Sequence, residues 1–212
     1  MNTAQCTEAS SSKSSESRFE VGDDFADTTL VVEDRKLHVN KALLMIHSPV
    51  FHKMFTTDFR EKESSEIPLP GKKYSTMVEL LGHIYPGHGA GFIKDDTLED
   101  ILQLADEYDV QQVFANCTQY INNILFSEDK LSTDRTLLYL GVVERYERLQ
   151  SLRSKLIERA SRIPANDMMR SKFFLLVPAT ATRDALLKQI LDYGSSIPME
   201  IKLQAQMKRY DW

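Results

Sequence analysis

Residues 25–55 have the sequence FADTTLVVEDRKLHVNKALLMIHSPVFHKMF, and this stretch decides the fold class. Its first half is rich in β-branched residues, which favour strands. A polar run at residues 33–36 separates residues 28–32 from residues 37–39, and two such segments around a polar turn are typical of a β-hairpin. The sequence therefore predicts a hairpin over residues 28–39.

Two helix starts follow the hairpin directly. Asn40 can accept a hydrogen bond from an unpaired backbone N–H, which makes it a suitable residue to begin a helix. Ser48 and Pro49 predict a second start, because serine caps a helix and proline needs no N–H in the first turn. The apolar residues of these two helices are Leu43, Leu44, Ile46, Val50, Phe51, Met54 and Phe55. A hairpin followed by helices indicates an α+β domain.

The middle of the chain adds one short strand and further helices. Residues 66–69 predict the strand, which Pro68 confines to a sheet edge because proline has no N–H to donate. Thr76 and Glu79 have the spacing of a capping box, which predicts a helix start at Thr76. We expect another helix to begin near Thr97.

Helical patterns continue to the end of the chain. After Asp109 apolar residues recur at a 3.6-residue period, at Val110, Val113, Phe114, Cys117, Ile121, Ile124 and Leu125. Beyond Ser127 we expect only helices, whose ends lie near Pro164, Pro178 and Gly194.

Composition and charge divide the chain into three predicted parts. Residues 1–22 are rich in serine and have too little apolar surface to offset the entropy of ordering, so we expect a disordered tail. Residues 23–126 form the α+β domain, and residues 127–212 form a helical extension. Up to residue 126 the chain has 11 Lys and Arg against 20 Asp and Glu, a net charge of −9; the extension has 15 against 11, a net charge of +4. Such an asymmetry is typical of two units with different surfaces.

The overall composition excludes several protein classes. The chain has 212 residues, 42% of them hydrophobic, and a net charge of −5, which is ordinary for a globular protein. No apolar run approaches the ~18 residues of a membrane-spanning helix, and the first residues lack a secretory signal pattern. The two cysteines, Cys6 and Cys117, cannot build a disulfide framework. We therefore expect a cytoplasmic or nuclear protein.

No catalytic or cofactor-binding constellation stands out. Residues 87–91 are glycine-rich but lack the Lys-Ser/Thr of a phosphate-binding loop. The histidines show no metal-ligand spacing. Ser48 beside His47 lacks the surroundings of a nucleophile elbow, and Cys117 lies on an apolar stripe, as core cysteines do. We predict no catalytic residue, no cofactor and no metal, and infer that the protein acts by binding.

Nucleic-acid binding is the weakest of the binding functions. The basic residues that crowd the extension are Arg145, Arg148, Arg153, Lys155, Arg159 and Arg162. Acidic residues are interleaved with them and can pair with them, and no aromatic platform accompanies them. Nucleic acid is therefore an unlikely partner.

Several blocks together resemble a BTB/POZ domain. They are Phe25 to Val32, Val39 to Leu44, His47 to Phe55, Glu66 to Leu69, His83 to Tyr85 and Leu104 to Val110, in the order and spacing of that family. The sequence is most similar to the BTB part of nematode MATH-BTB proteins, although no MATH-like segment precedes it. The resemblance covers about residues 23–126.

The resemblance implies both a fold and a function. The fold is a small three-stranded sheet flanked by helices, followed by an all-helical extension that is weakly similar to a BACK region. The function is protein–protein interaction without catalysis, as a homodimer and as a substrate-recruiting subunit of a cullin-3 type ubiquitin ligase. Met54 is the implied cullin anchor, with Tyr108 in the same groove and Phe59 and Glu61 on the adjoining loop. The implied dimer contacts are Phe25, Leu43 and Ile46.

Two departures from the family keep an alternative open. Thr56 replaces an acidic residue that follows the apolar anchor in many adaptors, and Asn40 replaces a frequent histidine. An oligomerisation scaffold without cullin binding is therefore the alternative function. The substrate protein of an adaptor is not identified by the sequence, and only residues 127–212 remain to bind it.

Overall fold

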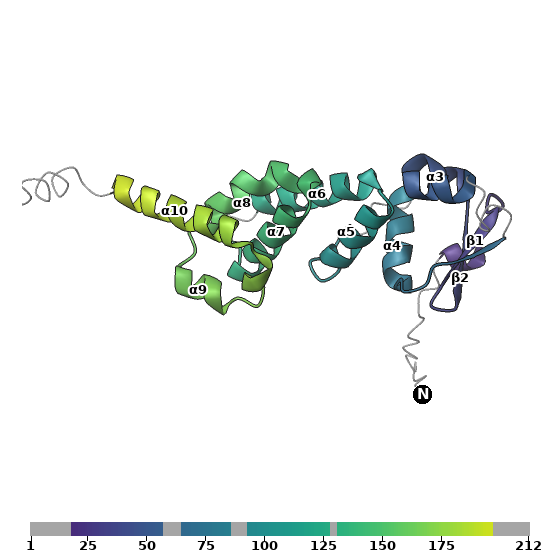
Figure 1. The fold of residues 1–212 in the computed structure, drawn as a ribbon, viewed down its shortest axis with the longest axis horizontal. Helices are drawn as coiled ribbons and strands as arrows, with labels where there is room; N and C mark the ends of the chain where they lie inside the picture. The colour runs from purple at the N-terminus through teal and green to yellow at the C-terminus, as the bar shows by residue number, and fades with distance from the viewer. Residues whose placement is uncertain (1–17, 57–64, 86–92, 128–130, 197–212) are drawn as a thin grey trace, which may run out of the picture. The chain divides into compact units, whose positions relative to one another are not determined.

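The computed structural model describes residues 18–56, 65–85, 93–127 and 131–196. Packing separates the chain into two compact units. Figure 1 shows the helices and strands, coloured by residue number. The first unit is Met1–Phe92 with Asp100–Gln112, and the second is Ile93–Glu99 with Val113–Trp212. The division therefore falls within two helices.

The first unit contains a small sheet and several helices. In chain order its elements are α1 (Arg18–Val21), β1 (Thr28–Val32), β2 (Arg35–Val39), α2 (Lys41–His47), α3 (Pro49–Thr56), β3 (Glu66–Pro68), α4 (Tyr74–Ile84) and most of α5 (Leu98–Glu107). The α+β class and the three-stranded sheet expected from the sequence are confirmed.

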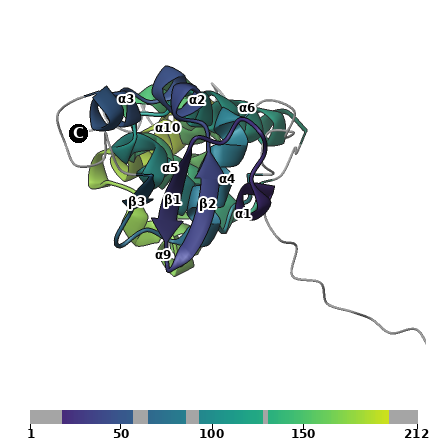
Figure 2. The ribbon, with the colours of Figure 1, turned by 90° about the vertical axis from the view of Figure 1, so that its right-hand side faces the viewer.

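The sheet has the order β2-β1-β3, as Figure 2 shows. β1 pairs antiparallel with β2, so that Leu30 lies opposite Leu37, and it pairs parallel with β3. The hairpin turns at Glu33 and Asp34, whose φ angles of 49° and 60° are those of a two-residue primed turn. β3 is an edge strand, as Pro68 predicts.

The two predicted N-caps at the start of α2 and α3 are present, but the predicted cap of α4 is wrong. Asn40 Oδ1 accepts the Leu43 N–H at 3.1 Å. α4 begins at Tyr74, so Thr76 lies inside the helix and is buried. The Tyr74 N–H instead donates to Glu33 Oε2 at 2.9 Å. A carboxylate 41 residues earlier in the chain therefore replaces the local capping box.

The expected disorder of residues 1–22 is wrong for α1. Phe19 is buried, and its ring meets that of Tyr85 edge-on with 5.1 Å between the centroids. The Arg18 guanidinium lies 5.0 Å from the centroid of the Tyr85 ring. The composition of residues 1–22 predicts disorder because it contains no information on Tyr85, the distant residue against which Phe19 packs.

The described part of the second unit is helical apart from its connections. Its elements are α6 (Gln111–Ser127), α7 (Thr133–Arg145), η2 (Glu147–Leu152), α8 (Arg153–Ala160), α9 (Ala165–Arg170), η3 (Phe174–Leu176) and α10 (Ala179–Ser196). The helical extension expected after residue 127 is confirmed. The predicted helix end at Gly194 is wrong, because α10 keeps its helical backbone through Ser196. Glycine ends a helix only where it takes a left-handed conformation.

Asp95 connects the segment before α5 to α6 and α7. Its carboxylate accepts hydrogen bonds from the Tyr139 hydroxyl at 2.5 Å and from the Tyr120 hydroxyl at 2.9 Å. Arg135 Nε donates to the same carboxylate at 2.8 Å. Burial, reinforced by Asp95, raises the pKa of Tyr139 above its ordinary value. The hydroxyl therefore remains a donor over the physiological pH range, and the segment before α5 stays attached to α7.

Gly141 allows η3 to approach α7 closely, which makes its replacement a test of the packing. A Cβ at this position would lie 2.9 Å from Leu176 Cβ and 3.1 Å from the Leu176 carbonyl oxygen. We predict that Gly141→Ala lowers the free energy of unfolding by about 1–3 kcal/mol, as overpacking does. Urea unfolding followed by circular dichroism measures the change.

Gly82 is the matched control, because a Cβ there would meet no atom within 4 Å. Gly82→Ala, also in a helix, is expected to raise the free energy of unfolding by about 0.5–1 kcal/mol. Equal effects of the two substitutions would contradict the proposed close contact at Gly141.

Candidate protein-interaction surface

Ser48 connects the start of α3 to the end of α5. Its side chain is fully buried, and its Oγ accepts the Phe51 N–H at 3.0 Å as the cap of α3. The same hydroxyl donates to the Tyr108 carbonyl at 2.5 Å. The donor and acceptor of this buried group are therefore both used, and α3 is fixed against a residue 60 positions away in the chain.

A stack of three aromatic rings lies beneath α3. The Phe51 ring stacks on Tyr108 with 4.6 Å between centroids and on Phe55 with 5.9 Å. Phe51, Phe55 and Tyr108 are all buried. Burial, with a smaller contribution from the Glu107 carboxylate, raises the pKa of Tyr108 to about 12. Because all three rings are buried and stacked, they give α3 a rigid, apolar base.

The turn after α5 holds Tyr108 in this position. Asp109 has a φ of 52°, which places it in the left-handed region. The Val110 N–H donates to the Ala105 carbonyl at 2.8 Å, and the Asp109 N–H donates to the Asp106 carbonyl at 3.3 Å. These two bonds form a Schellman motif with a non-glycine residue at its left-handed position. The sequence block 104–110 therefore has a structural role as a helix end.

Met54 borders this buried stack on the outer side of α3. It is half-buried, whereas Phe55 is buried, so the Met54 side chain reaches the surface. Met54 lies about 60° from Phe51 around the helix axis, since each residue turns the helix by about 100°. Thr56, the last residue of α3, donates its hydroxyl to the His52 carbonyl at 2.6 Å.

The other predicted site residues have different surroundings. Tyr108 is only 4% exposed, so it supports the surface from beneath Phe51 and does not present its ring to solvent. Phe59 and Glu61 lie outside the described residues. Among the predicted dimer contacts, Phe25 and Ile46 are 77% and 73% exposed and Leu43 is half-buried.

Phe25 and α2 are held together by backbone and side-chain hydrogen bonds. Asn40 Nδ2 donates to the Phe25 carbonyl at 2.6 Å, and the Lys41 N–H donates to Asp27 Oδ1 at 2.7 Å. The segment that carries Phe25 is therefore anchored at the start of the helix that carries Ile46. The motif therefore presents two exposed large apolar side chains, Phe25 and Ile46.

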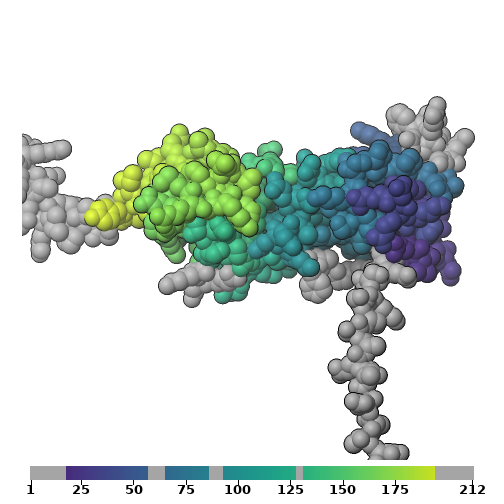
Figure 3. All heavy atoms as spheres, turned by 90° about the horizontal axis from the view of Figure 1, so that it is seen from below, coloured from purple at the N-terminus to yellow at the C-terminus, as the bar shows by residue number. Residues whose placement is uncertain are grey.

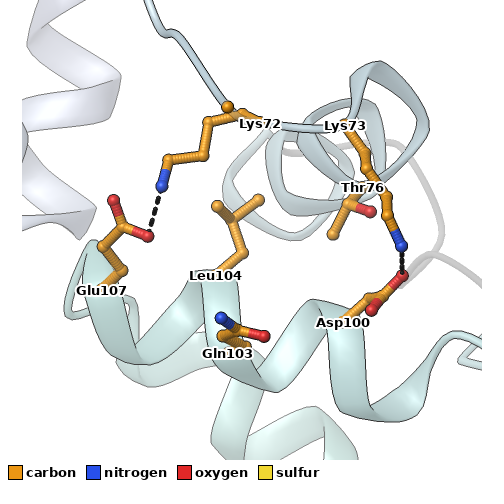
Figure 4. Close-up of a pocket in the computed structure, with 8 residues that line it drawn as sticks. Lys72, Lys73, Thr76, Asp100, Gln103, Leu104 and Glu107 are labelled. Atoms are coloured by element: carbon orange, nitrogen blue, oxygen red, sulfur yellow. Dashed lines mark hydrogen bonds and ion pairs between the residues drawn. The ribbon is translucent and has the colours of Figure 1, made fainter.

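A polar pocket of about 250 Å³ lies between the loop before α4 and one face of α5, as Figure 4 shows. Lys72 Nζ lies 2.5 Å from Glu107 Oε2, and Lys73 Nζ lies 2.6 Å from Asp100 Oδ2. Bonding to Asp100 raises the pKa of Lys73 above its ordinary value. Each ammonium group is already neutralised by a carboxylate, so this pocket favours neither an anion nor a cation.

The six basic side chains that the sequence brings together in the second unit all have partners within that unit. Arg153 donates to Glu144 at 2.6 Å and to Asp184 at 2.7 Å. The other contacts are Arg145 with Glu99, Arg148 over the Phe114 ring, Lys155 with Asn122, Arg159 with the Leu125 carbonyl, and Arg162 with Glu158. A phosphate backbone would have to compete with these partners, which weighs against the nucleic-acid alternative.

Among the described residues, no group of three or more His, Cys, Asp and Glu side chains is arranged to hold a metal ion. None of their helices is both long and apolar enough to cross a membrane.

Removal of the Ser48 hydroxyl tests its double role. We predict that Ser48→Ala lowers the free energy of unfolding by about 2–3 kcal/mol, because it removes a helix cap and leaves the buried Tyr108 carbonyl without its donor. Thermal and urea unfolding measure the loss. Ser132 is the matched control, since its exposed Oγ only accepts the Arg135 N–H at 3.3 Å. Ser132→Ala should cost about 0.5–1 kcal/mol, and an equal cost at both positions would contradict the role of the Tyr108 carbonyl.

Comparison with known proteins places residues 17–125 in a family. The model of the BTB/POZ domain matches residues 17–125. BTB and MATH domain-containing protein 38 of Caenorhabditis elegans is 38% identical over 111 residues, which are 52% of this chain and 27% of that protein. Kelch repeat and BTB domain-containing protein 4 of Mus musculus is 30% identical over 97 residues, which are 46% of this chain and 18% of that protein.

The matched region is therefore less than a third of each of these relatives. Among solved structures, the BTB domain of human gigaxonin is similar with a TM-score of 0.39 and 25% identity, over 45% of this chain and 77% of that one. Because the family model matches 109 of the 212 residues, the chain belongs to the BTB/POZ domain family.

Proposed function

We propose that the protein is a non-enzymatic adaptor that binds the N-terminal domain of cullin-3 through its BTB domain and recruits a substrate protein for ubiquitination. Family membership supports an interaction role, and relatives that combine BTB with kelch or MATH regions support an adaptor. Such an adaptor acts in the cytoplasm or the nucleus.

The observation that carries this proposal is the half-buried Met54 beside the buried rings of α3. Interface energy concentrates in a few apolar or aromatic anchors that rest on well-packed surroundings. Ser48 and the Tyr108 stack fix the backbone of α3, so Met54 is ordered before a partner arrives. Preorganisation of this kind reduces the entropy lost on binding.

A titration of the full chain with the cullin-3 N-terminal domain tests the proposed anchor. We expect binding at micromolar concentration or tighter and at least a ~10-fold loss of affinity in Met54→Ala, which corresponds to about 1.4 kcal/mol. Met54→Leu should retain most of the affinity, because the two apolar side chains have similar volumes. Isothermal titration calorimetry gives both values.

His52 provides the control on the same helix. It is exposed and lies on the side of α3 opposite Met54, so His52→Ala should leave affinity unchanged. No binding at tens of micromolar, or equal affinity of Met54→Ala and the unaltered chain, would contradict the cullin role.

Self-association is the second candidate function, as a scaffold that does not bind cullin. The exposed apolar side chains of Phe25 and Ile46, on a segment anchored by Asn40, favour it. Thr56 favours it too, because its hydroxyl is engaged with its own helix and it carries no charge for a partner.

Light scattering over a range of concentrations tests self-association. We predict a dimer with twice the 24.3 kDa chain mass, which the combined Phe25→Ser and Ile46→Glu substitutions convert to a monomer. Phe126→Glu, at a residue 94% exposed in the second unit, is the control and should leave the dimer intact. A mass that stays monomeric at every concentration would exclude a dimer.

A further inference from the structure

The second unit carries an apolar groove formed by η3 and α10. It has a volume of about 460 Å³, and most of its lining is apolar. The apolar residues that form it include Phe174, Leu175, Val177, Leu186, Leu187 and Ile190. Leu175 is 93% exposed and Ile190 is 65% exposed, so the described residues leave much of this surface uncovered. In Figure 3 the atoms of α10, in yellow and yellow-green, lie at the molecular surface.

The opposite side of α10 is firmly packed. Ala181 and Ala185 are fully buried, and Asp184 Oδ2 accepts a bond from Arg153 of α8 at 2.7 Å. Figure 1 shows α10 running beside α8. η3 is held in turn by its close approach to Gly141 on α7. Because both walls are fixed to the unit, the groove is preformed and does not depend on an occupant to shape it.

The sequence after α10 has the pattern of a segment that can fill this groove. From residue 197 to residue 208 apolar and polar residues alternate strictly, apart from a proline among the polar positions. The apolar positions are Ile197, Met199, Ile201, Leu203, Ala205 and Met207. Strict alternation is typical of an extended segment with one apolar face. Pro198 cannot continue α10 and biases Ile197 to an extended backbone.

The spacing of this segment matches the groove. Two residues of an extended segment advance about 6.6 Å along its axis. Four residues of a helix, slightly more than one turn, advance about 6 Å along the helix axis. If the chain reverses after Ser196 and runs back along α10, alternate residues fall at successive turns of the helix. Met199, Ile201 and Leu203 would then meet the exposed face that carries Ile190 and Leu187.

Covalent connection favours this segment over any separate partner. Because only a few residues separate it from the groove, its effective concentration there is on the order of millimolar. A foreign peptide of equal apolar character would have to exceed that concentration to displace it. We propose that residues 197–208 bind in the η3–α10 groove of their own chain as an extended strap, with Met199, Ile201 and Leu203 facing α10.

Paired cysteines in the full chain test the strap directly. In a Cys6→Ser background, Leu187→Cys is combined with Ile201→Cys in one variant and with Lys202→Cys in a matched variant. The two positions are neighbours in sequence but lie on opposite faces of an extended segment. We expect the 187–201 pair to form an intramolecular disulfide at least ~10-fold faster than the 187–202 pair under dilute oxidising conditions. Cys117 is buried and should not interfere.

A third substitution shows whether the groove causes the difference. Adding Ile190→Glu to both variants should make the two rates equal, because a buried carboxylate would expel the strap. Equal rates in the original pair would show an unbound tail and overturn the proposal. A disulfide-linked dimer in place of the monomeric product would assign the groove to a second copy and overturn it too. Neither readout involves cullin, so the outcome is independent of the proposed adaptor function.

Discussion

The buried hydroxyl of Ser48 is the constraint on which the first unit depends. It serves as acceptor for the N-terminus of α3 and as donor to the Tyr108 carbonyl, two groups that would otherwise be unpaired in the core. A buried polar group without a partner costs about 1–3 kcal/mol. Because Ser48 Oγ bonds to both groups, α3 is held against the end of α5. The Phe51–Tyr108 stack follows from that placement. The position of Met54 at the surface is therefore a consequence of an interaction in the core.

The charge split along the chain has a different meaning in the structure than in the sequence. In the first unit, Lys72 and Lys73 are both paired with carboxylates of α5. In the second unit, Arg153 lies between Glu144 and Asp184 and joins α8 to α10. Among the described residues after residue 126, Arg153 therefore contributes to the packing of helices and does not belong to an open basic face. Charge counted along a sequence cannot distinguish these two arrangements, because it contains no information on partners.

Features set by local physics were predictable, and features set by distant partners were not. The hairpin, the caps at Asn40 and Ser48 and the apolar stripe of α6 follow from spacing and side-chain chemistry within a few residues. The cap of α4 comes from Glu33, and Phe19 is ordered by Tyr85, each across a long stretch of chain. Within the candidate site, Met54 could be named from the family resemblance. The bond from Ser48 to the Tyr108 carbonyl, which supports α3, could not be predicted, because a backbone acceptor has no signature in the sequence.

The left-handed Asp109 shows how a sequence block can have a structural role that looks functional. Asparagine and aspartate tolerate this conformation better than other non-glycine residues, and the turn brings Val110 back to Ala105. Both side chains of that contact are fully buried. The motif therefore orients Tyr108 without presenting any group to a partner. The groups that can meet another protein or another segment of the chain are instead half-buried or exposed apolar side chains beside buried ones: Met54 in the first unit, and the η3–α10 face in the second. Since each rests on the core of its own unit, the two surfaces can be altered separately.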